Sequence, residues 1–330
     1  MTFPQSWRIA VCLLQLLLCL SLSERIVAFQ PTPGDETLFG IAALNEQTVI
    51  AVGESSTIIR TADGGKTWAT ISNPGTGELH SVFFLDQNNG WTVGQHGTIL
   101  RTANGGLSWK VQKSGTTTDL VGCYFLSPSA GWVSGFKGTL LKTANGGKTW
   151  ARQATDVNAD LWSISFADSL NGWIVGSSTT VLRTQDGGKH WKREQSELSN
   201  FLLSIQFVDK NSGWYVGGYG AIMKTSNGGA SWERQNTMED FSLFKVSNYL
   251  YSIRMNGEKN GCIVGSDGII LGTTNGGETW SIQESNTTDV LYSVTFGSKH
   301  AGWAAGRNGT ILNTTDGGST WNVKSVREHH

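Results

Sequence analysis

The octapeptide TADGGKTW occupies residues Thr61–Trp68, and its pattern, Thr-x-Asp/Asn-Gly-Gly-x-x-Trp, returns six more times along the 330-residue chain. The later copies begin at Thr102, Thr143, Thr184, Thr225, Thr273 and Thr314. Successive copies are separated by 41, 41, 41, 41, 48 and 41 residues. A period of this length is typical of repeat proteins, in which each unit is one supersecondary structure that buries its faces against its neighbours. The sequence therefore predicts seven similar units.

Each unit shows the same internal order ahead of its octapeptide, which we call the box. An alternating run such as Leu161–Phe166 is followed by a shorter apolar run such as Gly172–Gly176. Alternation with a period of two indicates a strand, and a turn ending in Gly then leads to a third strand. The box follows, and its Trp opens a fourth strand. We predict an all-β fold, a seven-bladed β-propeller of four-stranded antiparallel blades.

The box itself is best explained as a structural turn. Its third position holds a short acid or amide, namely Asp63, Asn104, Asn145, Asp186, Asn227, Asn275 and Asp316. Such a side chain accepts backbone N–H groups of the residues that follow, and the two Gly residues tolerate positive φ. A calcium loop would need several carboxylates, whereas four of the seven copies carry Asn. A phosphate-binding turn would lead into a helix rather than a strand.

The N-terminus has the features of a secretory signal. Arg8 precedes an apolar run of 12 residues, Ile9–Leu20, which is short for a membrane-spanning helix. The bulky Leu18 before Cys19 is unfavourable for lipidation, so we predict no lipid anchor. We expect a signal peptide over residues 1–23, a lead-in segment over 24–36, the propeller over 37–324 and a tail over 325–330. The protein would then be exported to a periplasm, thylakoid lumen or extracellular space, without a transmembrane segment in the mature chain.

Charge and cysteine content narrow the functional classes. A net charge of −1 argues against nucleic-acid binding. Cys123 and Cys262 fall on strands of blades 3 and 6, on opposite sides of the ring, so we expect no disulfide between them. We find no cofactor or metal motif and predict a monomer that uses neither.

The combined pattern resembles a known family. The box, together with GWTVGQHGTILRTANGG at Gly90–Gly106, resembles the photosystem II stability/assembly factor family of Asp-box (BNR-like) repeat propellers. The resemblance covers residues 37–324. It implies an exported or lumenal, non-enzymatic scaffold that binds an assembling membrane protein, a membrane-complex subunit, through a basic patch on the propeller.

One repeated position is cationic. Three residues before the Asp or Asn of the box stand Arg60, Arg101, Lys142, Arg183 and Lys224 in blades 1 to 5. In blades 6 and 7 the position holds Gly272 and Asn313. Because blades repeat by rotation, these five cations, the basic arc, should form a one-sided stripe. The arc is either a partner-binding patch centred on Arg101, Lys142 and Arg183, or a set of long stems packed between blades with their charged heads in water.

The starts of the inner strands should surround one mouth of the central channel. Possible contacts there are the acids Glu78, Asp119 and Asp160 and the aromatic residues Phe39, Trp162, Tyr251 and Tyr292. The 48-residue interval adds Phe241, Phe244 and Tyr249, which could bind a partner or cap the channel. Two carboxylates across a cleft are what glycoside hydrolysis requires. The alternative to a scaffold is therefore a glycan-binding or glycoside-hydrolysing Asp-box propeller, sialidase-like or xyloglucanase-like.

Overall fold

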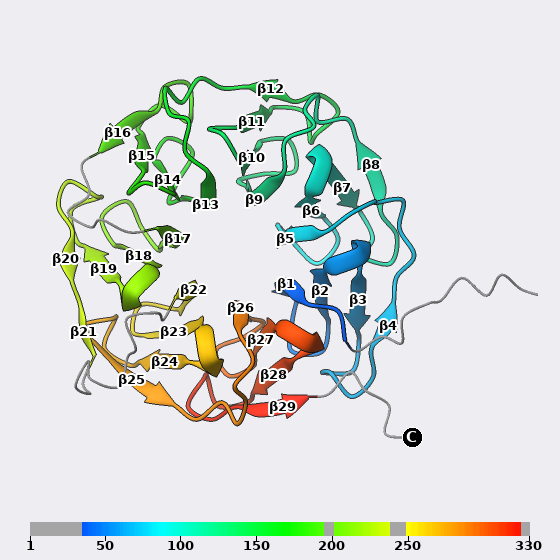
Figure 1. The fold of residues 1–330 in the computed structure, drawn as a ribbon, viewed down its shortest axis with the longest axis vertical. Coiled ribbons are helices and arrows are strands. Elements are labelled where there is room, and N and C mark those ends of the chain that lie inside the picture. The colour runs from blue at the N-terminus through cyan, green and yellow to red at the C-terminus, as the bar shows by residue number, and fades with distance from the viewer. Residues whose placement is uncertain (1–34, 195–200, 238–248, 325–330) are drawn as a thin grey trace, which may run out of the picture. The chain divides into compact units, whose positions relative to one another are not determined.

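The computed structural model describes residues 35–194, 201–237 and 249–324, which form seven blades in a ring (Figure 1). This confirms the predicted seven-bladed β-propeller. The predicted signal peptide, almost all of the lead-in segment, the tail, Phe241 and Phe244 lie outside the described residues. In the described part of the chain, no helix has the length and apolar character needed to cross a bilayer.

Each blade contains four consecutive antiparallel strands, ordered from the channel outward. Blade 1 has β1 (Leu38–Ala43), β2 (Val49–Gly53), β3 (Ile58–Thr61) and β4 (Ala69–Thr70). Blade 2 has β5 (Leu79–Phe84), β6 (Gly90–Gly94), β7 (Thr98–Thr102) and β8 (Lys110–Gln112). Blade 3 has β9 (Leu120–Phe125), β10 (Gly131–Gly135), β11 (Leu140–Thr143) and β12 (Ala151–Arg152). Blade 4 has β13 (Leu161–Phe166), β14 (Gly172–Gly176), β15 (Val181–Thr184) and β16 (Lys192–Glu194).

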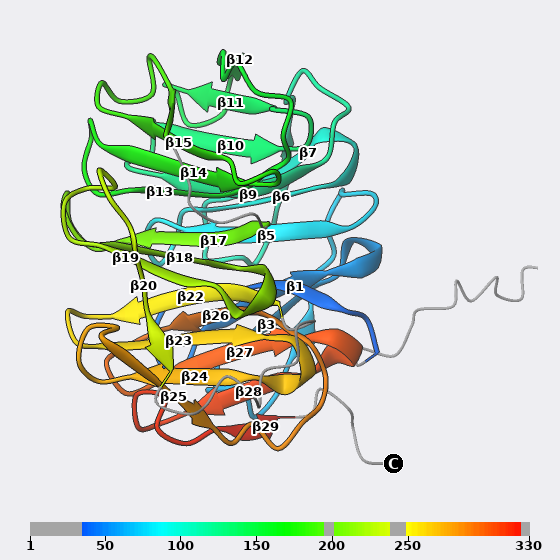
Figure 2. The same ribbon diagram turned by 60° about the vertical axis from the view of Figure 1, so that its left-hand side comes forward.

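The remaining three blades follow the same plan. Blade 5 has β17 (Leu202–Phe207), β18 (Gly213–Gly217), β19 (Ile222–Thr225) and β20 (Glu233–Arg234). Blade 6 has β22 (Leu250–Asn256), β23 (Asn260–Gly265), β24 (Ile270–Thr273) and β25 (Thr279–Gln283). Blade 7 has β26 (Leu291–Phe296), β27 (Gly302–Gly306), β28 (Ile311–Thr314) and β29 (Asn322–Lys324). Figure 2 shows β13, β14 and β15 lying side by side within blade 4.

Short 3-10 turns connect the second and third strands in five blades. They are η1 (Glu54–Ser56), η2 (Gln95–Gly97), η3 (Gly218–Gly220), η5 (Ser266–Gly268) and η6 (Arg307–Gly309). The middle residue of each has a positive φ, as at His96 with φ 57°. These turns lie at the same face of the ring as the starts of the inner strands, because the second strand runs antiparallel to the first.

Blade 6 carries one addition. β21 (Asn236–Thr237) pairs in parallel with Thr279–Trp280 of β25, so that the sheet of blade 6 has five strands. This added strand lies beside the outermost strand of blade 6 and precedes that blade's inner strand in the sequence.

A repeated aromatic stack packs the blades against one another. The Trp of the second strand lies face to face with the Phe that ends the inner strand of the next blade. The ring centroids are 3.5 Å apart for Trp91–Phe125, 4.1 Å for Trp132–Phe166 and 3.4 Å for Trp173–Phe207. The same Phe meets the box Trp of its own blade edge-on, as in Phe207–Trp232 at 5.8 Å. The edge-on contact is one of the favoured geometries of aromatic pairs.

Side chains also join the inner strands, which diverge around the channel. The hydroxyl of Ser163 in blade 4 accepts the backbone N–H of Ile205 in blade 5 at 3.2 Å, and Ser165 accepts that of Phe207 at 3.0 Å. Equivalent bonds run from Ile253 to Ser204, from Val294 to Ser252 and from Ile41 to Ser293. Serine thus supplies the acceptor that a neighbouring strand would supply in a continuous sheet.

In the described residues, the ring closes with each blade formed from one continuous stretch of chain, apart from the added strand of blade 6. Blade 1 is built entirely from the N-terminal end of the repeat region and blade 7 from its C-terminal end. Between them, Leu38, Ile41 and Ala51 of blade 1 pack with Trp303 and Ile311 of blade 7 in one buried cluster. Cys123 and Cys262 are both buried and unpaired, as the sequence predicted.

Candidate binding sites at the two faces of the propeller

Strand direction separates the predicted site residues into two groups. Inner strands start at one mouth of the channel, and third strands run the same way. Arg60, near the end of β3, pairs with Ile50 of β2, which in turn pairs with Ala42 near the end of β1. The three residues therefore lie at the same height in the blade. The basic arc and the boxes lie toward one face of the ring, whereas the predicted channel-mouth residues lie at the other.

Each box is held by its own side chains. The hydroxyl of Thr61 donates to Asp63 Oδ1 at 2.7 Å and accepts the N–H of Gly65 at 3.0 Å. Asp63 Oδ1 accepts the N–H groups of Lys66 and Thr67, both at 3.0 Å, and Oδ2 accepts the Thr67 hydroxyl at 2.6 Å. These hydrogen bonds, led by the Thr67 hydroxyl, hold the pKa of Asp63 well below its usual range.

The role of the first box Thr was not foreseen from the sequence. In all seven copies its hydroxyl accepts the N–H of the second Gly, as Thr143 does from Gly147 at 2.8 Å. The N–H of the first Gly donates to the loop between the first two strands of the same blade, as Gly146 does to Ser129 at 2.9 Å. The box therefore fastens the end of the third strand to the first hairpin of its blade.

The basic arc is half-buried against aromatic rings. Four of its cations lie over the Trp directly across on the second strand, at 5.5 Å for Arg101–Trp91, 5.1 Å for Lys142–Trp132, 5.8 Å for Arg183–Trp173 and 5.7 Å for Lys224–Trp214. Distances within about 6 Å of the centroid are those of cation–π contacts. Arg60 faces Ile50 instead.

Two members of the arc also reach the next blade. Arg60 Nε donates to the carbonyl of Gly105 at 2.9 Å, and Lys142 Nζ donates to that of Gly187 at 2.6 Å. Both acceptors are the first Gly of the following box. Burial lowers the pKa of Lys142, an effect that Asp186 opposes. Through these two residues the arc joins neighbouring blades, in addition to carrying positive charge.

Between blades 2 and 3 the arc borders a groove, which we call the basic groove. It has a volume of about 610 Å³ and is lined by Arg101 together with Lys110, Lys113 and Lys148. These three lysines are exposed, and none of the described residues that line the groove is a carboxylate. The groove was not predicted, because Lys110, Lys113 and Lys148 come from two different units.

At the opposite face, a β-bulge shapes the channel mouth. In blade 4, Leu161 pairs with Gly176 and Ser163 with Val175, which leaves Trp162 between them without a partner strand residue. The inner strands of all seven blades shift register in this way after their first residue. Bulges re-aim side chains, and here the second residue of each inner strand lines the mouth.

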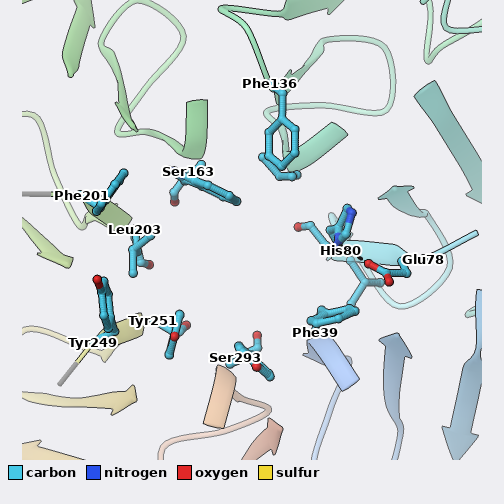
Figure 3. A pocket seen from close by; sticks show the side chains of 18 residues that line it. Phe39, Glu78, His80, Phe136, Ser163, Phe201, Leu203, Tyr249, Tyr251 and Ser293 are labelled. Atoms are coloured by element: carbon cyan, nitrogen blue, oxygen red, sulfur yellow. Dashed lines mark ion pairs between the residues drawn. The ribbon is translucent and has the colours of Figure 1, made fainter. Parts of the chain in front are cut away.

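The resulting pocket, the mouth pocket, has a volume of about 560 Å³ (Figure 3). Predicted residues that line it are Phe39, Glu78, Trp162, Tyr251 and Tyr292. Tyr249, from the 48-residue interval, also lines it, whereas His80, Phe136 and Phe201 were not foreseen there. Aromatic rings are continuous along one side, with centroids 5.4 Å apart for Phe39–Tyr292, 5.0 Å for Tyr251–Tyr292 and 6.1 Å for Tyr249–Tyr251.

The predicted acids do not converge on the pocket. Asp119 Oδ1 accepts the N–H of His96 at 2.8 Å, and Asp160 Oδ1 accepts that of Lys137 at 3.0 Å. Each acid thereby holds a turn of the preceding blade, at a residue with positive φ. Only Glu78 of the three lines the pocket. Burial lowers the pKa of the neighbouring His80, although Glu78 and Asp119 oppose that shift.

Comparison with known proteins identifies a family for this chain. The family model described as photosynthesis system II assembly factor YCF48 matches residues 28–103, 102–200, 189–286 and 279–330. Among proteins with curated functions, no sequence matches the chain.

Solved structures share the fold. YCF48 bound to a D1 peptide has a TM-score of 0.70 at 20% identity, covering 86% of this chain and 93% of that one. YCF48 from Cyanidioschyzon merolae has a TM-score of 0.69 at 18% identity, covering 87% and 97%. A GH74 xyloglucanase from Xanthomonas campestris has a TM-score of 0.70 at 9% identity, covering 89% of this chain but 55% of its own. With the family model matched over most of its length, the chain belongs to the family of the photosynthesis system II assembly factor YCF48.

Proposed function

We propose that this protein is an exported, non-catalytic scaffold that binds an acidic segment of a membrane-complex subunit during assembly of photosystem II. Binding occurs through the basic arc and the basic groove beside it. The observation that carries the proposal is the groove, whose charged lining residues are all cations: Arg101, Lys110, Lys113 and Lys148. A concave surface of one charge sign attracts a partner segment of the opposite sign and speeds its encounter.

Two further observations support a peptide-like partner and export. A similar solved structure is described as YCF48 bound to a D1 peptide, so a related propeller takes a protein segment as its ligand. The apolar run Ile9–Leu20 behind Arg8 supports passage across a membrane before folding. Both are consistent with the family to which the chain belongs.

The test reverses exposed charges without disturbing the arc's packing. The variant Lys110→Glu/Lys113→Glu/Lys148→Glu changes only exposed side chains in the groove. Its control is Lys66→Glu/Lys259→Glu/Lys299→Glu, three exposed lysines in blades 1, 6 and 7 that give the same change in net charge. Binding of a fluorescent D1 peptide at low salt should weaken by at least about tenfold in the groove variant and little in the control.

A second variant addresses the arc itself. Arg101→Met/Lys142→Met/Arg183→Met keeps apolar stems over the tryptophans and removes three charges. It should bind the D1 peptide more weakly, and the wild-type affinity should fall as salt rises. Equal affinity of the wild type for the D1 peptide and for a version with every Asp and Glu replaced by Asn and Gln would contradict the proposal.

The alternative of glycoside hydrolysis has less support. Its acid catalyst needs a carboxyl group with a raised pKa. Where the surroundings shift a carboxyl pKa among the described residues, the shift is downward, as for Asp86 and Asp168. Asp119 and Asp160 are engaged by backbone N–H groups. Hydrolysis of an aryl glycoside by the protein, abolished in Asp160→Asn, would overturn the non-catalytic assignment.

A further inference from the structure

Arg254 is the one inner-strand residue that brings a positive charge into the channel within the described part of the chain. It is the fifth residue of β22, two positions beyond Ser252, which lines the mouth pocket. The equivalent positions in the other blades hold Ala42, Phe83, Tyr124, Ser165, Gln206 and Thr295. Arg254 is thus one layer deeper in the channel than the pocket.

Arg254 belongs to the row of paired residues across the strands of a blade that, in blades 1 to 5, includes the cation of the basic arc. In blades 2 to 5 this row ends with a Trp on the second strand and a cation on the third, as in Trp214 and Lys224. In blade 6 the corresponding residues are Cys262 and Gly272, and the cation stands on the inner strand. Arg254 therefore has no aromatic ring of its own blade to lie on, and its charge faces the channel.

The Arg254 side chain is exposed to solvent, as expected of a residue on an inner strand that lines a channel. Burial lowers its pKa, and Tyr124, from blade 3 across the ring, opposes that shift. Tyr124 in turn donates its hydroxyl to the carbonyl of Phe166 at 2.8 Å. An arginine stays charged at neutral pH even when its pKa is reduced.

No carboxylate neutralises this charge in the described residues. The ion pairs there join His80 with Glu78 and His190 with Asp186. Neighbouring polar groups of the layer are committed to the ring wall, since Gln206 accepts the N–H of Met255 at 2.6 Å and Thr295 accepts that of Ala43 at 3.4 Å. A guanidinium without a carboxylate partner has its planar fork of donors available for an incoming carboxylate.

We propose that the central channel binds a slender organic anion whose apolar or aromatic body packs in the mouth pocket and whose carboxylate pairs with Arg254. The occupant must be elongated, because Arg254 lies three residues beyond Tyr251 and a strand advances about 3.3 Å per residue. A pocket of about 560 Å³ lies in the range that holds small organic ligands. A free small acid and the carboxyl end of an extended peptide share this chemistry.

The test compares acids with their uncharged amides on the full-length protein by calorimetric titration. The probes are 4-phenylbutyrate and its amide, and the pentapeptide AAAAF with a free or an amidated C-terminus. For whichever probe binds, the affinity of the amide should be lower than that of the acid by about tenfold or more, which corresponds to one well-paired charged hydrogen bond. The better-binding acid identifies the small molecule or the chain end as the occupant.

Substitutions in the channel test which residues bind the carboxylate and the body of the anion. Arg254→Gln should abolish the preference for acid over amide, and Arg254→Lys should restore part of it. Tyr251→Ala should weaken acid and amide alike, because it removes packing rather than charge. Arg152→Gln, on an exposed outer strand, is the control and should behave as wild type. Thermal unfolding of each variant confirms that it is folded.

Three outcomes would overturn the proposal. The first is that no probe binds the wild type at millimolar concentration. The second is that folded Arg254→Gln keeps the full preference for the acid. The third is that Arg307→Gln, at the exposed rim of the same mouth, removes the preference while Arg254→Gln does not.

Discussion

At the residue scale, Asp and Asn are interchangeable in the box because the side chain opposite them can donate or accept. Asp63 Oδ2 accepts the hydroxyl of Thr67 at 2.6 Å. In the Asn copies the direction reverses, so that Asn145 Nδ2 donates to the hydroxyl of Thr149 at 2.9 Å. In both, Oδ1 accepts the N–H of the residue four positions on. A hydroxyl serves as donor or acceptor, which explains why the acid is dispensable.

The acidic copies should nevertheless make stability depend on pH. Hydrogen bonds lower the pKa of Asp63, and they hold that of Asp316 at about 2 against the opposing effect of burial. A carboxyl group with a lowered folded-state pKa binds fewer protons than it does unfolded. Its full contribution to stability is therefore present above the pKa of the unfolded state, about 3.9, and is lost as the pH falls toward the pKa of the folded state.

We expect the double variant Asp63→Asn/Asp316→Asn to lose this pH-dependent part. The difference in free energy of unfolding between wild type and variant should shrink as the pH falls from about 4 to about 2. Denaturant unfolding at several pH values measures it. The matched control is Asn145→Asp, which should add a pH dependence of the same sign. A constant difference across this range would show that the box carboxylates do not titrate differently on folding.

At the element scale, three interfaces between blades, those of blades 2–3, 3–4 and 4–5, contain the same three-part stack. In the interface between blades 4 and 5, the Arg183 guanidinium lies over Trp173, and Trp173 lies face to face with Phe207. Gly213 opens the next strand of blade 5 beside that ring, and a Cβ there would come within 2.6 Å of Phe207. The Gly-Trp pair of the second strand is therefore one feature, in which Gly leaves room for the Phe of its own blade.

This stack predicts how stability depends on its members. Trp173→Ala should lower the free energy of unfolding by about 3–5 kcal/mol, the usual cost of deleting a buried Trp or Phe side chain. Phe207→Ala should cost a similar amount, and the double variant should cost less than the sum by about 0.5–1.5 kcal/mol. Denaturant unfolding of the four proteins gives the coupling. Full additivity would show that the two rings do not stabilise each other beyond their buried area.

The bulge of the inner strand is the element that strict alternation fails to predict. Period two places Leu161, Ser163 and Ser165 on one side of a regular strand, whereas the structure buries Leu161 and inserts Trp162 as an extra residue. Gly176 opposite accommodates this, because a Cβ there would come within 2.2 Å of the Asp160 carbonyl. The repeated final Gly of the second strand was the available signal for the bulge.

At the scale of the whole molecule, the seam between blades 7 and 1 is the interface that no connection within the described residues crosses. It has the same kind of contacts as the others, including the hydrogen bonds from Ile41 to Ser293 and from Ala43 to Thr295. Among the described residues, no strand is exchanged across it. The seam is therefore the interface at which we expect local opening to begin.

We therefore expect Trp303→Ala, at the seam, to act differently from Trp91→Ala, between connected blades. Both remove a fully buried ring. In native-state hydrogen exchange, the seam variant should speed exchange of the β1 and β26 amides at denaturant concentrations that leave the other blades protected. Trp91→Ala should show no comparable local opening. Uniform acceleration in all blades of both variants would show that the ring opens only by global unfolding.

The sequence by itself determined the number of blades and the internal order of each. It also determined the turn chemistry, because these depend on residues a few positions apart. Tertiary structure alone decided what lies between blades and across the ring. Lys148 shares one groove with Lys110 of the preceding blade, Arg60 donates to the carbonyl of Gly105, and Trp91 stacks on Phe125. Such contacts join residues of neighbouring blades that are far apart in the sequence. They arise only when seven twisted blades close, since the rotation between neighbours sets which side chains converge.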